Sequence, residues 1–160
     1  MIRAIMAADQ ENGIGKNGTI PWKSSADLQW FKYSTLDSVV VMGRKTWDDP
    51  MIPKPLPKRF NIVVSNRKIE SGPNMIINSD KNLESILSSF TADVWIIGGA
   101  TLFNQTYHLC EEILISRIPG TYNCDTFVKL PEYFHYDSTE TINNIKGEAT
   151  IERYKNDRVS

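Results

Sequence analysis

The amino-acid sequence predicts an α/β fold with a mixed, mostly parallel central β-sheet, flanking helices and an antiparallel edge formed by the C-terminal part of the chain. Short apolar segments rich in β-branched residues alternate with amphipathic segments. This alternation is typical of parallel β-α-β units, which place helices on both faces of a sheet. Near the C-terminus, polar and apolar residues alternate one by one, which favours antiparallel strands at one edge.

The first part of the chain predicts a strand, a loop, a helix and a second strand. Arg3–Ala8 is a strand-length apolar run, and the glycines and proline of Asp9–Trp22 predict a long loop after it. Ser25–Leu36 has the spacing of an amphipathic helix. Ser38–Met42 is a β-branched run that predicts a buried strand, and Gly43 ends it.

The middle of the chain predicts a short helix and two more strands. The helix covers Arg44–Asp48 and starts directly from the preceding strand. Prolines at positions 50, 53, 55 and 57 exclude a helix and predict a stiff loop. Phe60–Ser65 and Asn74–Ile77 are apolar runs that predict the two strands.

The next segments continue the alternation. Asn82–Phe90 predicts a helix capped by Ser79 or Asp80. Asp93–Ile97 predicts a strand that runs into the pair Gly98-Gly99.

The last segments complete the sheet. Ala100–Leu109 predicts a helix and Glu112–Ile118 a strand. From Phe134 onward the alternating pattern, as in Thr150-Ile151-Glu152-Arg153-Tyr154, predicts the antiparallel strands.

The composition predicts one soluble domain over residues 1–160 and argues against nucleic-acid and membrane partners. The chain is 41% hydrophobic and 23% charged, with a net charge of -1, so no overall field attracts a polyanion. Cys110 and Cys124 lack a CxxC spacing, and His108 and His135 have no ligand-spaced partners. We therefore expect free thiols, no metal site, a cytoplasmic location and a monomer.

Asp27 is the first candidate functional residue. If Ser24 or Ser25 caps the predicted helix, Asp27 lies in its first turn with Phe31 one turn further along the same face and Leu28 beside them. Ser24-x-x-Asp27 is compatible with a capping box that only complements the helix dipole. A carboxylate framed by apolar side chains is also suited to a flat, nitrogen-rich heterocycle.

Three predicted strands end in segments that could bind phosphate. Gly43-Arg44-Lys45-Thr46 and Asn66-Arg67-Lys68 carry adjacent cations, and Gly98-Gly99-Ala100-Thr101 forms a small-residue turn before a helix. Each segment alone is compatible with solvated loop charges or with a tight turn. In a parallel sheet these strand ends lie at one edge, where ligands bind. Together they predict a pyrophosphate site with cations for an extra phosphate, which favours NADP over NAD.

The order of these motifs resembles dihydrofolate reductase along the whole chain. The segments that carry the resemblance are Ile14-Gly15, Ile20-Pro21-Trp22, Ala26-Asp27-Leu28, Trp30-Phe31-Lys32, Val41 to Trp47, Pro55-Leu56-Pro57 with Arg59, Ile96 to Ala100, and Cys124-Asp125-Thr126. The resemblance implies reduction of 7,8-dihydrofolate to tetrahydrofolate with NADPH, binding of antifolate inhibitors, and the corresponding fold.

The resemblance also implies roles for individual residues. Asp27 would bind the pterin and support protonation of N5, Ser116 would bond that carboxylate, and Trp22 would hold a water nearby. The residues implied to bind substrate are Ile5, Ala7, Leu28, Phe31, Met51, Ile52, Leu56, Arg59 and Ile97, with Arg59 pairing with the glutamate α-carboxylate. Whether Met51 or Ile52 contacts the substrate stays open, because the loop around them is slightly long.

The implied cofactor site is drawn from five parts of the chain. Its residues are Ala7, Ile14, Gly15, Ile20, Gly43, Arg44, Lys45, Thr46, Ser65, Asn66, Arg67, Ile97, Gly98, Gly99, Ala100, Thr101, Leu102 and Phe103. The resemblance further implies a cis peptide bond between Gly98 and Gly99, with glycine needed at both positions to avoid Cβ clashes.

Two other functions share this predicted fold. A pyrimidine reductase of riboflavin synthesis would use the same NADPH site, but that family lacks the set formed by Trp22, Asp27 and Arg59. A non-catalytic binding module would tolerate the loss of Asp27 or of Gly98-Gly99, and all three residues are present.

Overall fold

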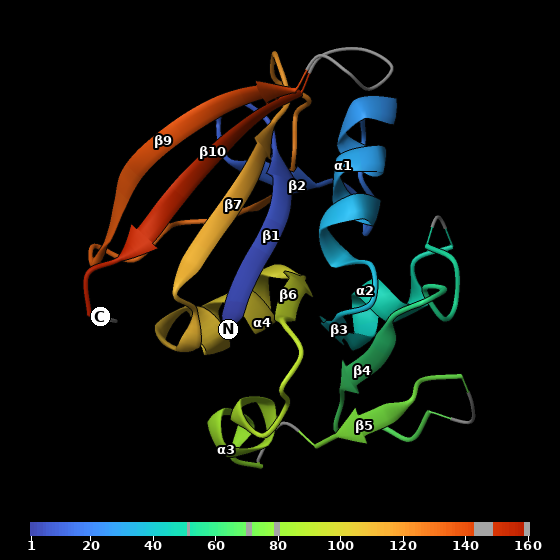
Figure 1. Ribbon diagram of the computed structural model, residues 1–160. Coiled ribbons are helices and arrows are strands. Elements are labelled where there is room, and N and C mark those ends of the chain that lie inside the picture. The colour runs from blue at the N-terminus through green and yellow to red at the C-terminus, as the bar shows by residue number, and fades with distance from the viewer. Residues whose placement is uncertain (51, 70–71, 79–80, 143–148, 159–160) are drawn as a thin grey trace.

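The computed structural model describes residues 1–50, 52–69, 72–78, 81–142 and 149–158. Its centre is an eight-stranded sheet in the order β5-β4-β3-β6-β1-β7-β10-β9. The strands are β1 Ile2–Ala8, β3 Val39–Gly43, β4 Phe60–Val64, β5 Met75–Ile77, β6 Val94–Gly98, β7 Glu112–Arg117, β9 Phe134–Ile142 and β10 Ala149–Asn156. The six strands from β5 to β7 pair in parallel, and β10 runs antiparallel to β7 and β9. The predicted mixed sheet with an antiparallel C-terminal edge is confirmed (Figure 1).

Helices pack against the sheet at the positions that the alternation predicts. They are α1 Ser25–Thr35, α2 Arg44–Asp48, α3 Leu83–Ser88, α4 Ala100–Thr106 and the 3-10 helix η1 Tyr107–Leu109. Among the described residues, no helix is long and apolar enough to cross a membrane.

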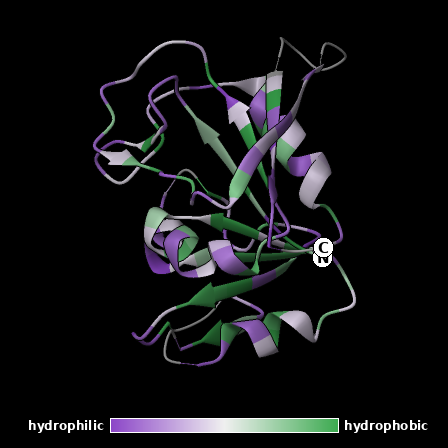
Figure 2. Ribbon diagram, turned by 90° about the vertical axis from the view of Figure 1, so that its left-hand side faces the viewer, coloured by the Kyte–Doolittle hydropathy of each residue, from purple (hydrophilic) through white to green (hydrophobic). Residues whose placement is uncertain are grey.

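The core consists of two clusters separated by the sheet. Successive residues of a strand point to opposite faces, and neighbouring core residues accordingly fall into different clusters, such as Ala4 and Ile5, or Val40 and Val41. One cluster includes Trp30 of α1, and the other includes Leu102 of α4. The hydropathy colouring shows the central strands as the most apolar part of the chain (Figure 2).

The structure differs from the sequence prediction mainly in short elements. Two short strands, β2 Gly13–Gly15 and β8 Thr126–Phe127, pair with each other. β2 lies inside the predicted loop Asp9–Trp22, and β8 lies in a segment for which no element was predicted. The predicted helix 100–109 changes to 3-10 geometry at Tyr107. Helix α3 is shorter than predicted, and its cap is Asn82, which accepts a hydrogen bond from the Ser85 amide. The predicted caps at positions 79 and 80 lie outside the described residues.

The middle of the sheet opens where β1 and β6 separate. Their pairing runs from Ile2 and Val94 to Ala4 and Ile96 and ends there. Beyond this point β1 continues beside β7 to Ala8, while β6 shifts register against β3. The ends of β1 and β6 therefore flank a gap in the hydrogen-bonded ladder, and this gap positions the candidate site.

Candidate active site

Asp27 lies at the start of α1 and is partly buried. Of the two possible caps, Ser24 and Ser25, the Ser24 side chain caps this helix by accepting a hydrogen bond from the Asp27 amide at 3.2 Å. Burial raises the pKa of the Asp27 carboxyl group to about 6, and a hydrogen bond with Ser116 acts in the opposite direction. Asp27 is thus more than a capping residue, because its carboxylate lies in an environment that disfavours charge.

Ser116 comes to Asp27 from the end of β7. In the sheet, Ser116 is beside Ala7 of β1 on one side and Ile151 of β10 on the other. The Ser116 side chain is buried, and Ile151 belongs to the same core cluster as Trp30 of α1. The sheet therefore presents a hydroxyl group to the helix that carries Asp27.

Most of the predicted apolar substrate residues lie in this same cluster. Ile5 and Leu56 are among its buried members, and Phe31, Ile52 and Ile97 pack against it with part of their surface exposed. Leu28 does not join the cluster, since 63% of its surface is exposed. Ile5 and Ile97 also stand directly after the last paired residues of β1 and β6. Ile5 and Ile97 thus place this apolar cluster next to the gap in the sheet. Met51 lies outside the described residues.

Trp22 is buried at the end of the loop that follows β1. Its ring packs edge-on against Tyr122, with 5.4 Å between the ring centroids. The indole Nε1 is buried and has no hydrogen-bond partner among the described residues. A buried donor of this kind is normally satisfied by water or by a ligand. Tyr122 was not among the predicted site residues, because only the fold brings its loop to Trp22.

Arg59 is held in place by two oxygen atoms. Its Nε donates to the Pro57 carbonyl at 2.9 Å, and its Nη1 donates to Thr35 Oγ1 at 3.1 Å. The guanidinium carbon lies 6.0 Å from the centre of the Phe31 ring, and burial lowers the pKa of Arg59. Thr35 was missed by sequence reasoning, although its position one turn after Phe31 places both on the same face of α1.

The ends of β3 and β6 meet in a junction of glycines. A Cβ atom on Gly43 would lie 3.7 Å from the Gly98 carbonyl oxygen, and one on Gly99 would lie 3.8 Å from Thr46 Oγ1. The peptide bond between Gly98 and Gly99 is cis, as predicted. Only Gly98 has a positive φ, +123°, and its Cβ would approach the Phe103 ring at 3.4 Å. Beyond its chain neighbours, a Cβ atom on Gly99 would make only ordinary contact, so the conformational need for glycine is visible at Gly98.

Two helices start at this junction without a side-chain cap. Helix α2 begins after Gly43 and α4 after Gly99, and neither N-cap residue forms a side-chain hydrogen bond. The amide groups of a first helical turn have no partners within the helix. Together with the glycines, which allow close approach, these amides can accommodate a phosphate-bearing group.

The predicted cations lie beside the glycine junction. Arg44 donates from Nη1 to the Lys68 carbonyl at 3.1 Å and from Nε to Asp48 at 3.3 Å. The Ser65 hydroxyl donates to the Arg67 carbonyl at 3.0 Å and accepts from the Arg67 amide at 3.0 Å. The loops after β3 and β4 are thus joined.

The other predicted cofactor residues are distributed between surface and core. Lys45, Asn66, Arg67 and Thr101 are exposed, as is 45% of the surface of Ile20. Ile14 packs against the core cluster on the α4 side. The Leu102 and Phe103 side chains are buried in that cluster, so these two residues can reach a ligand only through their backbones. The remaining members, Ala7, Gly15 and Ala100, are partly buried.

The arrangement combines one partly buried acid, an apolar slot, an oriented guanidinium group and a phosphate site. The described residues contain no group of three or more acidic, histidine or cysteine side chains that could hold a metal ion. The acid can bind a nitrogen-rich ring, and the guanidinium group can bind a carboxylate at the outer end of the same molecule. The junction of β3 and β6 is suited to a nucleotide.

Comparison with known proteins gives a consistent result. The dihydrofolate reductase family matches residues 1–158. A dihydrofolate reductase of Buchnera aphidicola is 36% identical over 136 residues, covering 84% of this chain and 79% of that protein. One from Haemophilus influenzae is 35% identical over 123 residues, covering 77% and 75%. The structure of the Enterococcus faecalis dihydrofolate reductase complexed with NADP(H) and RAB-propyl superposes with a TM-score of 0.80 at 27% identity, covering 98% and 96%.

Proposed function

The chain belongs to the dihydrofolate reductase family, and we propose that Asp27 is the acid on which its reaction depends. The reaction is the NADPH-dependent reduction of 7,8-dihydrofolate to 5,6,7,8-tetrahydrofolate. The C6–N5 double bond gains a hydride at C6 and a proton at N5, and NADPH is oxidised to NADP+. The observation that carries the assignment of Asp27 is its partly buried carboxylate beside Ser116, with a pKa raised to about 6 by burial.

In this assignment Asp27 recognises the pterin ring. An ionised carboxylate accepts hydrogen bonds from the exocyclic amino group and from N3, and Ser116 fixes its orientation. The negative charge of this carboxylate, placed against the pterin, favours the protonated form of the ring and so supports protonation of N5. The buried Nε1 of Trp22 supplies a donor for a water molecule at the edge of the ring. The same carboxylate would form a charge-assisted pair with protonated diaminopyrimidine antifolates.

The rest of the substrate extends along α1. The pterin lies between Ile5 and Ile97, where β1 and β6 separate. Phe31, Leu56 and the exposed Leu28 flank the aminobenzoyl ring, an apolar contact that explains why Leu28 is not in the core. Arg59 binds the glutamate α-carboxylate in a two-pronged contact, for which Thr35 and Pro57 have already oriented the guanidinium group.

The residues of the glycine junction fit NADPH. Gly43, Gly98 and Gly99 leave room for the backbone to approach the pyrophosphate, and the uncapped first turns of α2 and α4 provide amide donors. Arg44, with Asn66 or Arg67, would bind the 2′-phosphate. Bound NADPH supplies the hydride, and the protein aligns the two rings and excludes water from them.

The assignment of Asp27 is tested by Asp27→Asn, which removes the charge and keeps the size of the side chain. Loss of NADPH absorbance on addition of dihydrofolate should slow by about two orders of magnitude or more at neutral pH, while NADPH binding stays nearly unchanged. Asp37→Asn is a matched control, because Asp37 lies just beyond the other end of α1 with φ +58°, a conformation that asparagine tolerates. Wild-type turnover by Asp27→Asn at neutral pH would refute the assignment.

A further inference from the structure

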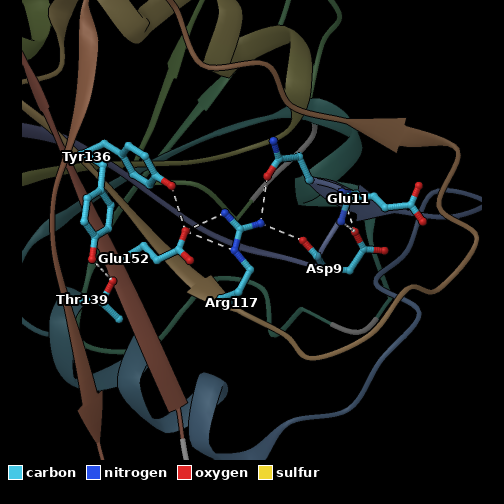
Figure 3. A network of polar contacts seen from close by, with 9 residues as sticks. Asp9, Glu11, Arg117, Tyr136, Thr139 and Glu152 are labelled. Carbon is cyan, nitrogen blue, oxygen red and sulfur yellow. Dashed lines mark hydrogen bonds and ion pairs between the residues drawn. The ribbon is translucent and has the colours of Figure 1, made fainter.

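Arg117, the residue after Ser116, connects the neighbouring strand β10 to the loop that leads to Trp22. Its Nη1 donates to the Asp9 carbonyl at 2.7 Å and to Asn12 Oδ1 at 2.8 Å. Its Nε and Nη2 donate to one oxygen of Glu152 at 3.2 and 2.7 Å. Figure 3 shows the guanidinium group between Glu152 and the segment of Asp9. One side chain thus joins β10 to the first turn of loop 9–22.

The anchor of this contact is Glu152, which accepts three hydrogen bonds at one oxygen. Glu152 is two residues from the direct partner of Arg117 on the neighbouring strand, so both side chains lie on the same face of the sheet. The Tyr154 hydroxyl donates to the same Glu152 oxygen at 2.9 Å. The Arg117 and Glu152 side chains are only 18% and 20% exposed, so solvent screens the pair less than it screens an exposed pair.

The turn that Arg117 holds is organised around the buried carboxylate of Asp9. One Asp9 oxygen accepts from the amides of Glu11 and Gly13, both at 2.9 Å. The other accepts from the Tyr122 amide at 3.1 Å and the Cys124 thiol at 3.6 Å. Burial alone would raise the pKa of Asp9, but these hydrogen bonds lower it overall. Loop 9–22 and loop 118–125 are therefore fastened to each other at Asp9.

The fastened loops lead directly into the active site. Tyr122, whose amide binds Asp9, packs its ring against Trp22 at 5.4 Å. Gly13 begins the short strand β2, which pairs with β8 and carries the predicted cofactor residues Ile14 and Gly15. A shift in the turn at Asp9 would therefore move groups on both sides of the reacting rings.

We propose that Arg117 is a positioning residue for the reaction, which fixes loop 9–22 so that Trp22, Ile14 and Gly15 meet the substrate and the nicotinamide. This inference rests on the proposed function. Arg117 acts through the loop from the face of the sheet opposite Ser116, because adjacent residues of a strand point to opposite faces. The dihydrofolate tail, which Arg59 would bind, is outside its reach.

The chain offers a closely matched control for Arg117. Arg153 of β10 donates to Glu112 of β7 at 2.7 Å. This ion pair joins the same two strands as the pair of Arg117 and Glu152, whose shortest distance is also 2.7 Å. Among the described residues, the Arg153 side chain forms its hydrogen bond and ion pair with Glu112 and none with loop 9–22. Arg117→Met and Arg153→Met each remove one such pair, and we expect both to lower the thermal unfolding temperature. The decrease should be larger for Arg117→Met, which also removes two hydrogen bonds, whereas Glu112 keeps its ion pair with Arg3 in Arg153→Met. Only the first also removes a contact with the loop.

The test compares binding, kinetics and exchange in these two variants. Arg117→Met should lower the hydride-transfer rate by about tenfold and weaken NADPH binding several-fold, with the KM for dihydrofolate nearly unchanged. Arg153→Met should leave all three unchanged. Backbone hydrogen exchange at Gly13 should be faster in Arg117→Met only. Arg117→Lys keeps the charge but loses the planar set of guanidinium donors, and it should recover part of the rate.

Asn12→Gly isolates the contact with the loop. Asn12 has φ +65°, which glycine adopts readily, so this variant keeps the turn. It removes one of the two loop acceptors for Arg117, the Asn12 Oδ1, and leaves the Asp9 carbonyl. It should reproduce part of the loss in rate and NADPH affinity. Equal hydride-transfer rates and NADPH affinities in Arg117→Met and Arg153→Met would overturn the inference, even if Gly13 exchanged faster. Absence of dihydrofolate turnover in the wild type would instead contradict the proposed function, and NADPH binding and exchange would still test the role of Arg117.

Discussion

Asp27 illustrates the conflict between stability and chemistry at a single residue. Its pKa in the folded protein is about 6 because the carboxyl group is buried, whereas an unfolded chain gives about 3.9. The charged form is therefore less favourable in the folded protein than in the unfolded one. The cost to stability is absent below about pH 4, grows as pH rises, and is complete above about pH 6. A carboxyl group whose pKa is raised by burial, at a cost to stability, is typical of a functional site.

Removing this charge should stabilise the protein. We expect Asp27→Asn to raise the free energy of unfolding by about 1–2 kcal/mol above pH 7, with the gain disappearing toward pH 4. The lost interaction of the carboxylate with the N-terminus of α1 reduces the gain. Urea unfolding at several pH values measures it. A variant that is less stable than the wild type at pH 7 would show that the carboxylate stabilises the fold.

Arg59 should discriminate between ligands by their tails. Arg59→Lys keeps the charge but loses the planar pair of donors oriented by Thr35 and Pro57. Dihydrofolate binding should weaken by about 1–3 kcal/mol, which is typical of a charged hydrogen bond. A pterin without the glutamate tail should bind as it does to the wild type. Calorimetric titration of both ligands measures the difference, and equal losses would make Arg59 a structural residue.

At the scale of elements, the two glycines at the end of β6 have different functions. Gly98 has φ +123°, a backbone conformation that strains any residue with a Cβ, whereas Gly99 has φ -84°. Gly98→Ala should therefore destabilise the protein by about 1–3 kcal/mol, and Gly99→Ala should change stability by less than about 1 kcal/mol. Thermal unfolding compares them. The reverse order of stabilities would contradict this account of the junction.

Elements with a strong local pattern could be predicted from the sequence, and elements that depend on distant partners could not. Helix α2 has its predicted bounds, and the predicted β1, β4 and β7 are within one residue of the observed strands. Strands β2 and β8 have three and two residues and exist because two distant loops pair. The end of α4 was also missed, since its change to 3-10 geometry at Tyr107 has no local sequence signal.

In the candidate site too, residues within local motifs could be predicted, and residues that act through distant contacts could not. Asp27 and the glycine junction could be identified from motifs, and Ser116 from the family resemblance that these motifs carry. The structure brings Asp27 and Ser116 together. Thr35, Tyr122 and Arg117 could not be assigned in this way, because each acts on a residue that only the fold brings near. Their contacts join segments 24, 100 and 108 residues apart in the sequence.

At the scale of the whole molecule, the two faces of the sheet carry different parts of the protein: the candidate active site on one face and the residues that hold the neighbouring loops on the other. The face that carries Ile5, Leu114 and Ile151 packs against α1 and includes the pocket of Asp27. The opposite face carries the core beneath α4 and the network of Arg117 and Glu152. Because β7 contributes Ser116 to one face and Arg117 to the other, movement of this strand end would affect both.

The central claim is that one carboxyl group with a pKa near 6 controls the reaction, and the pH dependence of hydride transfer tests it most directly. The reacting complex carries one extra proton, so that N5 can be protonated while the Asp27 carboxylate is ionised, and this proton is lost above about pH 6. Single-turnover measurements with NADPH and dihydrofolate should therefore give a wild-type rate that is constant below about pH 6 and falls about tenfold per pH unit well above it. In Asp27→Asn the rate should be far lower at pH 7 and should rise continuously as pH falls, because only substrate protonated in solution reacts. Identical rates and pH profiles for the two proteins would contradict the account.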